Sequence, residues 1–327
     1  MPIEPQQVRL TNKNGLELLI SSLGASVLAL KVPDRKGQLV NVVLGFSNAS
    51  AYLSENYLNN CVYMGCTVGR YAGRISRGFF KIDGTKYNIY HDNGVSLHGG
   101  KEGFDKKNWE IDHIENGDSS KVTLSYLSRD MEEGYPGNLK VTATYELTQN
   151  NKFIITYFAE TDKTTHVNIT NHNYYNLDGA GDILKHDLKL NCPKYVETDA
   201  HLLPSGELRA VTNKYDYLEE RTIGDNGFSG LDDTFIFGDN EEKAVLSSMK
   251  SGIKMSIATN QPSVVIFTPS NFNTFVFNDG ASFNDYPAIC FETQKLPDTP
   301  NNEHFPSTLL RPGEIYENRT VLTFTNI

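Results

Sequence analysis

The sequence predicts an all-β protein, a large antiparallel β-sandwich, and three features support this fold class. Apolar and polar residues alternate with a period of two in many short segments, which indicates strands with one buried face. The helical period is poorly represented, and turn-forming dipeptides with glycine are frequent. The 327 residues include 17 Tyr and 17 Phe, and aromatic side chains are enriched in strands.

The clearest strands form a predicted hairpin in the middle of the chain. In residues 141–147 the apolar and polar side chains alternate, so one face of the segment is apolar and the other polar. A polar turn at 149–152 leads into a second strand at 153–159, which we expect to pair antiparallel with the first. Similar patterns predict further strands at residues 16–20, 26–32, 40–45, 121–127, 165–171, 263–268, 288–293 and 320–325.

Helix is expected at only two places. We predict two turns in residues 47–56 and one or two turns in residues 215–221, because no longer segment sustains a helical stripe. Turns between strands are marked by Asp83-Gly84, Asn93-Gly94, Asn116-Gly117 and Pro136-Gly137. No linker or low-complexity segment interrupts the chain, so residues 1–327 are expected to form a single domain.

The charge balance and the amino-terminal segment limit the possible partners and compartment. The formal net charge is −10, and an acidic surface repels phosphate groups, so neither nucleic acid nor membrane is expected as a partner. Residues 1–5 lack the basic and apolar regions of a signal peptide, and no apolar run reaches 18 residues. We therefore expect a cytoplasmic protein.

The cysteines and glycine-rich segments give no sign of a metal or cofactor. Cys61, Cys66, Cys192 and Cys290 form no C-x-x-C pair and match no zinc motif, and we expect reduced, mostly buried thiols. The glycine-rich motifs of dinucleotide and nucleoside triphosphate sites are absent. No cofactor and no metal are therefore expected.

Two predicted strands carry unusual polar residues. The alternation in residues 167–172 places His172 at the end of a polar row, which indicates a strand that lines a wet cleft. A lone histidine is more often a hydrogen-bonded structural residue, so that interpretation stays open. Glu292 lies in the apolar strand 288–293, where burial would raise its pKa and make it a better base. A solvent-facing glutamate on an edge strand fits the pattern equally well.

Two loop-like segments carry charged or polar side chains between glycines. Residues 69–74 place two arginines among glycines, and residues 96–100 place His98 before a glycine pair that lets backbone approach a ligand. Each segment alone also fits a surface turn with an exposed side chain. Neither segment identifies a ligand by itself.

Six segments, in order along nearly the whole chain, match the motifs of one known family. They are residues 69–75 (GRYAGRI), 97–100 (LHGG), 133–137 (EGYPG), 171–177 (NHNYYNL), 230–233 (GLDD) and 291–298 (FETQKLPD). These segments resemble the aldose 1-epimerases, also called galactose mutarotases. The fold that this resemblance implies is the supersandwich, or galactose mutarotase-like β-sandwich, which agrees with the strand pattern.

The resemblance also implies a site and an activity. Glu292 matches the catalytic base of the family and His172 matches the catalytic acid. The positions that match sugar-hydroxyl ligands or the lining of the pocket are Arg74, His98, Asp232 and Tyr174. The implied reaction interconverts the α and β anomers of free aldohexoses such as galactose and glucose by acid–base opening and closure of the ring. The partner would be a free monosaccharide. The sequence does not set the oligomeric state, and a monomer and a homodimer are both compatible with it.

Two positions depart from the family pattern. The family often has histidine where this chain has Asp233, which affects the support for the orientation of Asp232. Many members have glutamine where this chain has Val265, so one contact to the sugar is expected to be missing or replaced.

Two alternatives to this activity stay open. A hexose-6-phosphate 1-epimerase would need an added cluster of basic residues for the phosphate, and the motifs carry none. A non-catalytic sugar-binding protein of the same fold would be expected to lose the acid–base pair, yet Glu292 and His172 are both present.

For the epimerase we expect a bell-shaped pH profile, with the acid limb due mainly to Glu292 and the alkaline limb to His172.

Overall fold

The largest element of the structure is a nine-stranded antiparallel sheet. The computed structural model describes residues 4–327 except 61, 118, 226, 273–274 and 278–279. In spatial order the nine strands are β10 (Glu110–Glu115), β11 (Ser119–Ser128), β12 (Leu139–Thr148), β13 (Lys152–Thr161), β27 (Tyr316–Asn326), β23 (Ile253–Thr259), β22 (Ala244–Ser248), β17 (His186–Leu190) and β20 (Arg221–Thr222).

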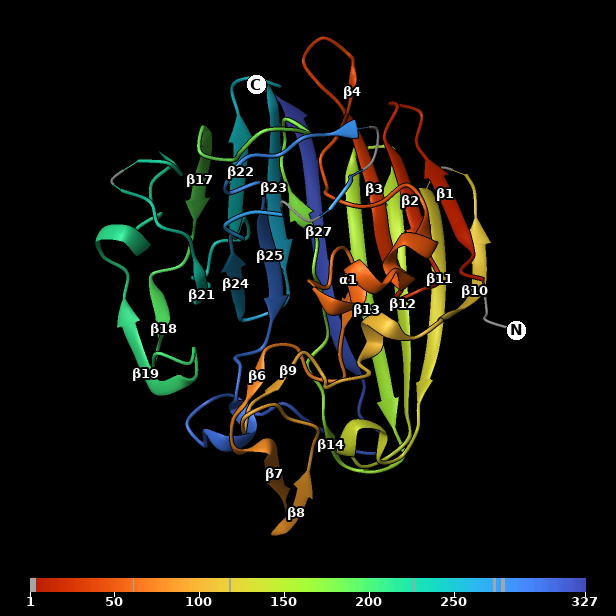
Figure 1. The fold of residues 1–327 in the computed structure, drawn as a ribbon, viewed down its shortest axis with the longest axis vertical. Helices are drawn as coiled ribbons and strands as arrows, with labels where there is room; N and C mark the ends of the chain where they lie inside the picture. Colours follow the sequence, from red (N-terminus) through yellow and green to blue (C-terminus); the bar gives the residue numbers. More distant parts are fainter. Residues whose placement is uncertain (1–3, 61, 118, 226, 273–274, 278–279) are drawn as a thin grey trace.

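Two further sheets cover one face of the nine-stranded sheet (Figure 1). A four-stranded sheet contains β1 (Gln7–Thr11), β2 (Glu17–Ser21), β3 (Ser26–Pro33) and β4 (Leu39–Asn41). A six-stranded sheet contains, in spatial order, β16 (Tyr174–Tyr175), β25 (Ile289–Gln294), β24 (Ser263–Phe267), β21 (Asp232–Ile236), β18 (Lys194–Thr198) and β19 (Pro204–Ala210).

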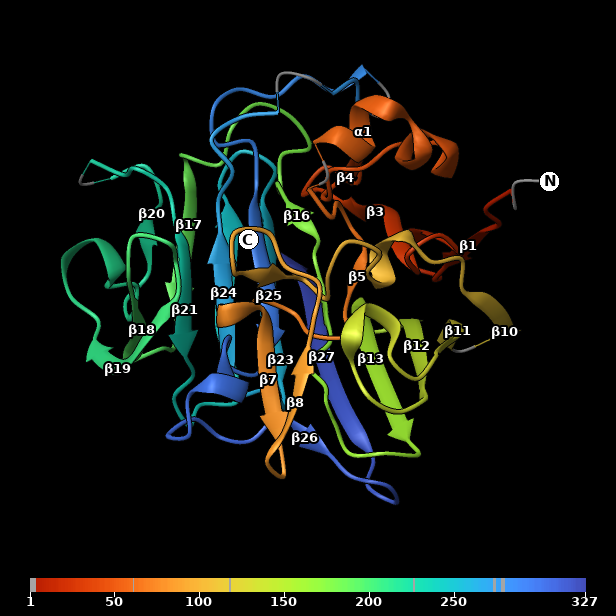
Figure 2. The ribbon, with the colours of Figure 1, turned by 60° about the horizontal axis from the view of Figure 1, so that its bottom comes forward.

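Four short two-stranded ribbons complete the strand inventory of the described residues. They pair β5 (Thr67–Val68) with β15 (Thr170–Asn171), β6 (Arg74–Ile75) with β9 (Ser96–Leu97), β7 (Phe79–Ile82) with β8 (Thr85–Asn88), and β14 (Thr165–His166) with β26 (Leu309–Leu310). The β6–β9 ribbon and the β7–β8 hairpin lie beyond the end to which β25 points, and Figure 2 brings this end of the molecule forward.

The main core lies between the sheets and follows from the period-two pattern. On β12, the side chains of Val141, Ala143, Tyr145 and Leu147 are buried, whereas those between them are partly exposed. These four pack in one cluster with apolar residues of the four-stranded and six-stranded sheets. Burial of such faces is the main stabilising contribution to a sandwich. The predicted all-β sandwich and the predicted hairpin of β12 and β13 are confirmed.

Helical structure is sparse in the described residues. The expected turns at 47–56 appear as the 3-10 helix η1 (Ala49–Leu53) and the α-helix α1 (Glu55–Asn59). Asn48 and Ser54 cap them, because their side-chain oxygens accept backbone N–H groups. The other 3-10 turns are η2 (Ser76–Gly78), η3 (Phe104–Lys106), η4 (Glu132–Gly134), η5 (Asn213–Tyr215) and η7 (Thr299–Asn301). No helix among the described residues is long and apolar enough to cross a membrane.

Two predicted elements are wrong. The predicted helical turns at 215–221 are absent, because η5 ends at Tyr215, the first residue of this segment, and β20 begins at Arg221, its last. The predicted strand 165–171 is broken into β14 and β15, which belong to different ribbons. Between them, buried polar groups replace a regular ladder, as when Nδ2 of Asn168 donates to the carbonyl oxygens of Ala72 and Lys295. The alternation in this segment therefore reflects buried hydrogen bonds rather than one long strand.

The cysteine prediction holds where the structure describes it. Cys66, Cys192 and Cys290 are buried and form no disulfide within the described part of the chain. Cys61 lies outside the described residues.

Candidate active site

A cavity of about 200 Å³ opens above the six-stranded sheet. Three neighbouring strands supply its floor, because Glu292 on β25 pairs with Val265 on β24, and Val265 pairs with Thr234 on β21. In the next row Asp232 pairs with Phe267. Side chains two residues apart on a strand share a face, so the polar groups of the floor surround an apolar centre.

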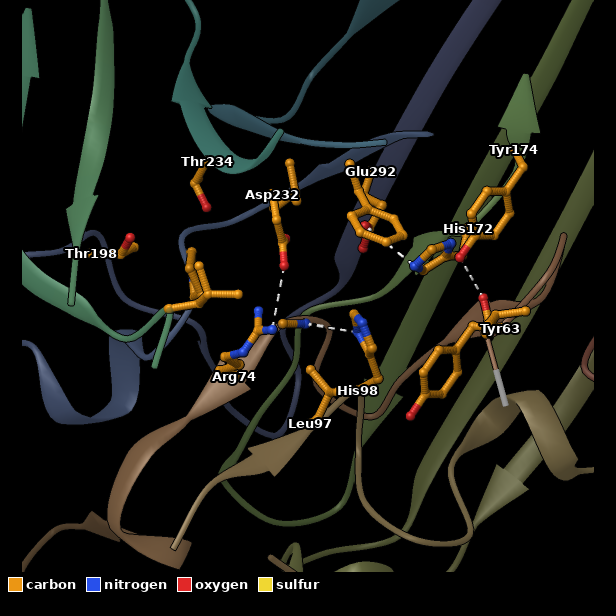
Figure 3. Close-up of a pocket in the computed structure, with 16 residues that line it drawn as sticks. Tyr63, Arg74, Leu97, His98, His172, Tyr174, Thr198, Asp232, Thr234 and Glu292 are labelled. Atoms are coloured by element: carbon orange, nitrogen blue, oxygen red, sulfur yellow. Dashed lines mark hydrogen bonds and ion pairs between the residues drawn. The ribbon is translucent and has the colours of Figure 1, made fainter. Parts of the chain in front are cut away.

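The opposite wall comes from the β6–β9 ribbon, which joins two of the sequence motifs. Arg74 pairs with Leu97, and the backbone N–H of His98 donates to the carbonyl oxygen of Gly73 at 3.0 Å. The pairing brings Arg74 and His98 to one side of the cavity, and Figure 3 shows both reaching toward Asp232 and Glu292 on the opposite side.

Glycines make this ribbon possible. Gly99 has a φ of 91°, and a Cβ atom there would lie 1.9 Å from the carbonyl oxygen of Gly69. Any side chain at this position would push apart the two segments that carry Arg74 and His98.

Other motif residues support the wall from behind. Glu133 accepts the backbone N–H of Lys101 through Oε2 at 2.9 Å and lies against Gly100. Asp298 accepts the N–H of Ser76 at 2.9 Å. Arg70, the first arginine of its motif, is buried and donates to backbone carbonyl groups, including those of Pro136 and Gly137 at 3.0 Å. These motif residues act as structural supports.

Glu292 and His172 form a buried pair at the base of the cavity. Oε1 of Glu292 lies 3.4 Å from Nε2 of His172, and their side chains are 3% and 4% exposed. The second carboxyl oxygen of Glu292, Oε2, is buried and has no hydrogen-bond partner among the described residues. A buried polar atom without a partner is costly, so this oxygen is suited to receive a hydroxyl group of a ligand.

Burial moves the pKa values of the pair in opposite directions. Burial, with a smaller contribution from the charge of Asp232, raises the pKa of Glu292 to about 8. Burial lowers the pKa of His172 to about 4. Attraction within the pair favours the charged forms and opposes these shifts. Because both side chains are almost completely desolvated, we take the neutral forms as the resting state near pH 6.

His98 is a neutral hydrogen-bond donor in this cavity. Burial, together with the nearby His172 and Arg74, holds the pKa of His98 well below its ordinary value. Its Nδ1 accepts the backbone N–H of Gly73 at 3.2 Å, so the hydrogen of the neutral ring resides on Nε2. The ring of Tyr63 lies edge-on to His98, with 4.6 Å between their centroids.

Arg74 and Asp232 meet across the cavity. Nη2 of Arg74 lies 3.5 Å from Oδ2 of Asp232, and their side chains are 25% and 31% exposed. Asp233 does not line the cavity. Its Oδ2 accepts the backbone N–H of Asp232 at 3.2 Å, and burial raises its pKa. The residue that departs from the family pattern therefore supports the backbone of Asp232 from the other face of β21.

Tyr174 lines the cavity, but its hydroxyl group is already bonded. It donates to the carbonyl oxygen of Val62 at 2.7 Å, and its ring lies 5.0 Å from that of His172. Tyr174 thus buttresses His172. All six site residues predicted from the sequence line this one cavity: Arg74, His98, His172, Tyr174, Asp232 and Glu292.

Three of these side chains have the composition of a metal site. Ligand atoms of His98, His172 and Glu292 all lie within 4.8 Å of one another. A metal-bound histidine needs a free lone pair on its coordinating nitrogen. In His98 the lone pair of Nδ1 is taken by Gly73 and Nε2 carries the hydrogen, so a metal could bind this ring only if the ring rotated or moved its hydrogen to Nδ1 and lost the bond to Gly73.

Comparison with known proteins identifies the relatives of this chain. The model of the aldose 1-epimerase family matches residues 6–323. The chain belongs to the aldose 1-epimerase family. It is 37% identical to the galactose mutarotase of Bos taurus over 323 residues, which cover 95% of this chain and 91% of the relative. It is 30% identical to the aldose 1-epimerase of Escherichia coli K12 over 332 residues, covering 96% and 94% of the two chains.

Solved structures of this family share the fold. An aldose epimerase homologue from C. elegans superposes with a TM-score of 0.90 at 28% identity, covering 99% of each chain. The galactose 1-epimerase of Lactobacillus acidophilus NCFM gives a TM-score of 0.85 at 27% identity, covering 98% of this chain and 95% of that one. The supersandwich expected from the resemblance is thereby confirmed.

Several residues that line the cavity of this family member were not predicted from the sequence. Thr234 and Phe267 belong to the floor, and Tyr63, Thr198 and Leu202 lie on loops or at a strand end. Thr234 follows Asp232 by two residues, so the period-two rule offered a signal for it. The other positions depend on how loops fold over the sheet, and no local pattern marks them.

Proposed function

We propose that this family member interconverts the α and β anomers of a free aldohexose such as galactose or glucose. The observation that carries the proposal is the desolvated Glu292–His172 pair, with 3.4 Å between Oε1 and Nε2, at the base of a cavity of about 200 Å³. A cavity below the ~300–1,000 Å³ of drug-sized sites suits one monosaccharide. The relatives named galactose mutarotase and aldose 1-epimerase support the same reaction.

The reaction needs proton transfer at two oxygen atoms. Glu292 in its ionised form removes the proton of the C1 hydroxyl group while protonated His172 donates its Nε2 hydrogen to the ring oxygen. The C1–O5 bond breaks and leaves an open-chain aldehyde. Rotation about C1–C2 presents the other face of the carbonyl group, and closure with the two proton transfers reversed gives the other anomer. Each transfer typically contributes ~10²–10⁴-fold to the rate.

The remaining polar residues would hold the sugar. The hydroxyl groups of the sugar would meet both donors and an acceptor. The donors are Nε2–H of His98 and the guanidinium of Arg74, and the acceptor is the carboxylate of Asp232. Val265 and Phe267 form the apolar centre of the floor, which suits the C–H face of a pyranose ring. Holding the ring at several hydroxyl groups fixes C1 and O5 against the acid–base pair.

The alternatives are weakened by specific features of the cavity. A hexose 6-phosphate would need cations for its dianion, but Arg74, already paired with Asp232, is the sole Lys or Arg among the described residues that line the cavity. A purely binding protein would have no use for a buried carboxyl group with a raised pKa beside a histidine. Both alternatives therefore rank below epimerase activity on a free sugar.

Polarimetry tests the proposal directly. The protein is expected to equilibrate freshly dissolved α-galactose and α-glucose faster than buffer alone, and to act more weakly on glucose 6-phosphate. Equilibration at the spontaneous rate for every free sugar, with binding still detected by calorimetry, would favour the non-catalytic alternative. Preference for the phosphorylated sugar would favour the hexose-6-phosphate 1-epimerase.

The pH profile of kcat/KM is expected to be a bell with limbs near the shifted pKa values. Between about 4 and about 8 the pair shares one proton along Oε1···Nε2, and moving it onto His172 creates the reactive form. Below this range both groups are protonated, and above it the shared proton is lost. The order expected from the sequence is thus reversed, because the acid limb follows His172 and the alkaline limb Glu292.

His172→Asn checks this assignment through its residual activity. Measured from pH 3 to 10, the variant is expected to lose the acid limb and keep a limb that reports Glu292. Retention of an unmoved acid limb would contradict the assignment.

Removal of metal is expected to leave activity unchanged. The lone pair of Nδ1 in His98 is occupied, and the proposed chemistry moves only protons. The check is dialysis against a strong chelator followed by polarimetry, with the undialysed protein as the control. Loss of activity that added zinc, magnesium or calcium restores would overturn this prediction.

We further propose that the protein acts in the cytoplasm, as the sequence predicts, and that it is a monomer or a homodimer. Cell fractionation and light scattering of the purified protein test these two statements.

A further inference from the structure

Both ring nitrogens of His172 face the same strand, β25. Nε2 lies 3.4 Å from Oε1 of Glu292, and Nδ1 lies 3.7 Å from Sγ of Cys290. Cys290 and Glu292 are two residues apart, so their side chains leave one face of the strand. One strand therefore contacts the imidazole at both of its hydrogen-bonding atoms.

The thiol of Cys290 stays protonated beside His172. Cys290 is fully buried, and burial, together with the charge of Glu292, raises the pKa of its thiol well above the ordinary value. A neutral thiol is a weak donor and a weak acceptor, so it can serve either form of the imidazole.

Glu292 decides which nitrogen carries the hydrogen of the neutral ring. Burial favours the protonated carboxyl group, whose O–H is a strong donor to a ring nitrogen. Because Oε1 faces Nε2, the carboxyl group donates there and the ring hydrogen resides on Nδ1, directed at the sulfur of Cys290.

We propose that Cys290 is a positioning residue that accepts the Nδ1–H of His172 and reserves Nε2 for proton transfer. The inference rests on the proposed function, since it assigns a role beside that acid–base pair. When the ring opens, the Nε2–H bond breaks and an O5–H bond forms, which leaves neutral His172 with its hydrogen on Nδ1. Closure returns the proton to Nε2. The Nδ1–H group and the thiol keep their hydrogens throughout, so one acceptor serves every step.

The tautomer of His172 can be measured without any substrate. Two-bond nitrogen–proton correlation NMR of protein labelled with ¹⁵N-histidine distinguishes the two tautomers, and comparison with His172→Asn assigns the signal. At pH 6 the wild type and Cys290→Ser are expected to show the Nδ1–H form. Cys290→Val, which has no acceptor, is expected to lose this preference. An Nε2–H tautomer in the wild type, or an unchanged one in Cys290→Val, would overturn the proposal.

Steady-state kinetics gives a second, independent test. Cys290→Val is expected to lower kcat about threefold to tenfold, the worth of one hydrogen bond, with KM unchanged because Cys290 does not line the cavity. Cys290→Ser should retain activity within about twofold, since a hydroxyl also accepts. Cys192→Val, at a buried thiol outside the cavity, is the matched control and should leave kcat unchanged.

The outcomes separate this inference from the proposed function. A rise in KM, or equal losses in Cys290→Ser and Cys290→Val, would indicate a packing role and overturn the proposal; if Cys290→Val fails to fold, Cys290→Ala takes its place. If the wild type epimerises no free sugar, the proposed function fails, while the tautomer measured in the free protein still shows whether Cys290 accepts the Nδ1 hydrogen.

Discussion

Glu292→Gln is expected to lower kcat by about 10²–10⁴-fold, the range usually lost with a general base. The glutamine amide keeps the shape of the side chain but cannot accept the proton of the C1 hydroxyl group. The fold should be retained, because the change removes a fully buried ionisable group whose charged form is costly. We expect a melting temperature equal to that of the wild type or higher. Polarimetry and thermal denaturation measure the two effects.

Asp233→Asn is the matched control for this prediction. Asp233 is also an acidic residue with a pKa raised by burial, yet its side chain bonds to the backbone of Asp232 and does not line the cavity. Its replacement should change kcat by no more than a few fold. Turnover close to the wild type from a folded Glu292→Gln protein would remove Glu292 from the role of base.

His172→Asn is expected to reduce kcat by a similar factor, about 10²–10⁴-fold, because it removes the acid that protonates the ring oxygen. An amide group does not release a proton at any pH used for the assay. The side chain is 4% exposed and packs on Tyr174, so thermal denaturation must accompany the kinetics to separate loss of chemistry from loss of structure.

His98→Asn provides the comparison for His172→Asn. The proposed role of His98 is to hold a sugar hydroxyl group, which affects the ground state and the transition state alike, so KM should rise and kcat should fall. His172→Asn should act mainly on kcat. Should His98→Asn prove inactive and His172→Asn nearly normal, the two histidines would have to exchange roles.

How far the fold could be predicted depended on the strength of each local pattern. The hairpin of β12 and β13 was predictable because apolar and polar side chains alternate along its strands, which gives one buried face, and because a polar turn joins them. Both features are encoded within about twenty residues. Strand β17, next to the edge strand β20 of the same sheet, was not predicted. It is short, and its pairing with β22 joins residues about sixty positions apart, which no local pattern reports.

The segment before His172 shows how the prediction of a site residue can rest on a wrong element. The alternation of residues 167–172 was interpreted as a strand lining a wet cleft, whereas its polar side chains are buried donors to backbone carbonyl groups. His172 lies just beyond β15 and reaches the cavity from there. Buried hydrogen bonding and exposure to a cleft both require polar residues, so the sequence pattern did not distinguish them.

The sequence by itself determined the fold class, through period-two burial, and pointed to the proposed acid–base pair, through motifs that resemble those of one family. Only the tertiary structure decided how close those residues lie to one another and which protonation states they adopt. Only packing places Glu292 and His172 together out of water, and desolvation then sets the order of their pKa values. Likewise, only the β6–β9 pairing joins Arg74 to His98, and only the adjacency of strand and loop sets Cys290 against Nδ1 of His172. Distances and desolvation arise between segments far apart in the chain, so local sequence cannot specify them.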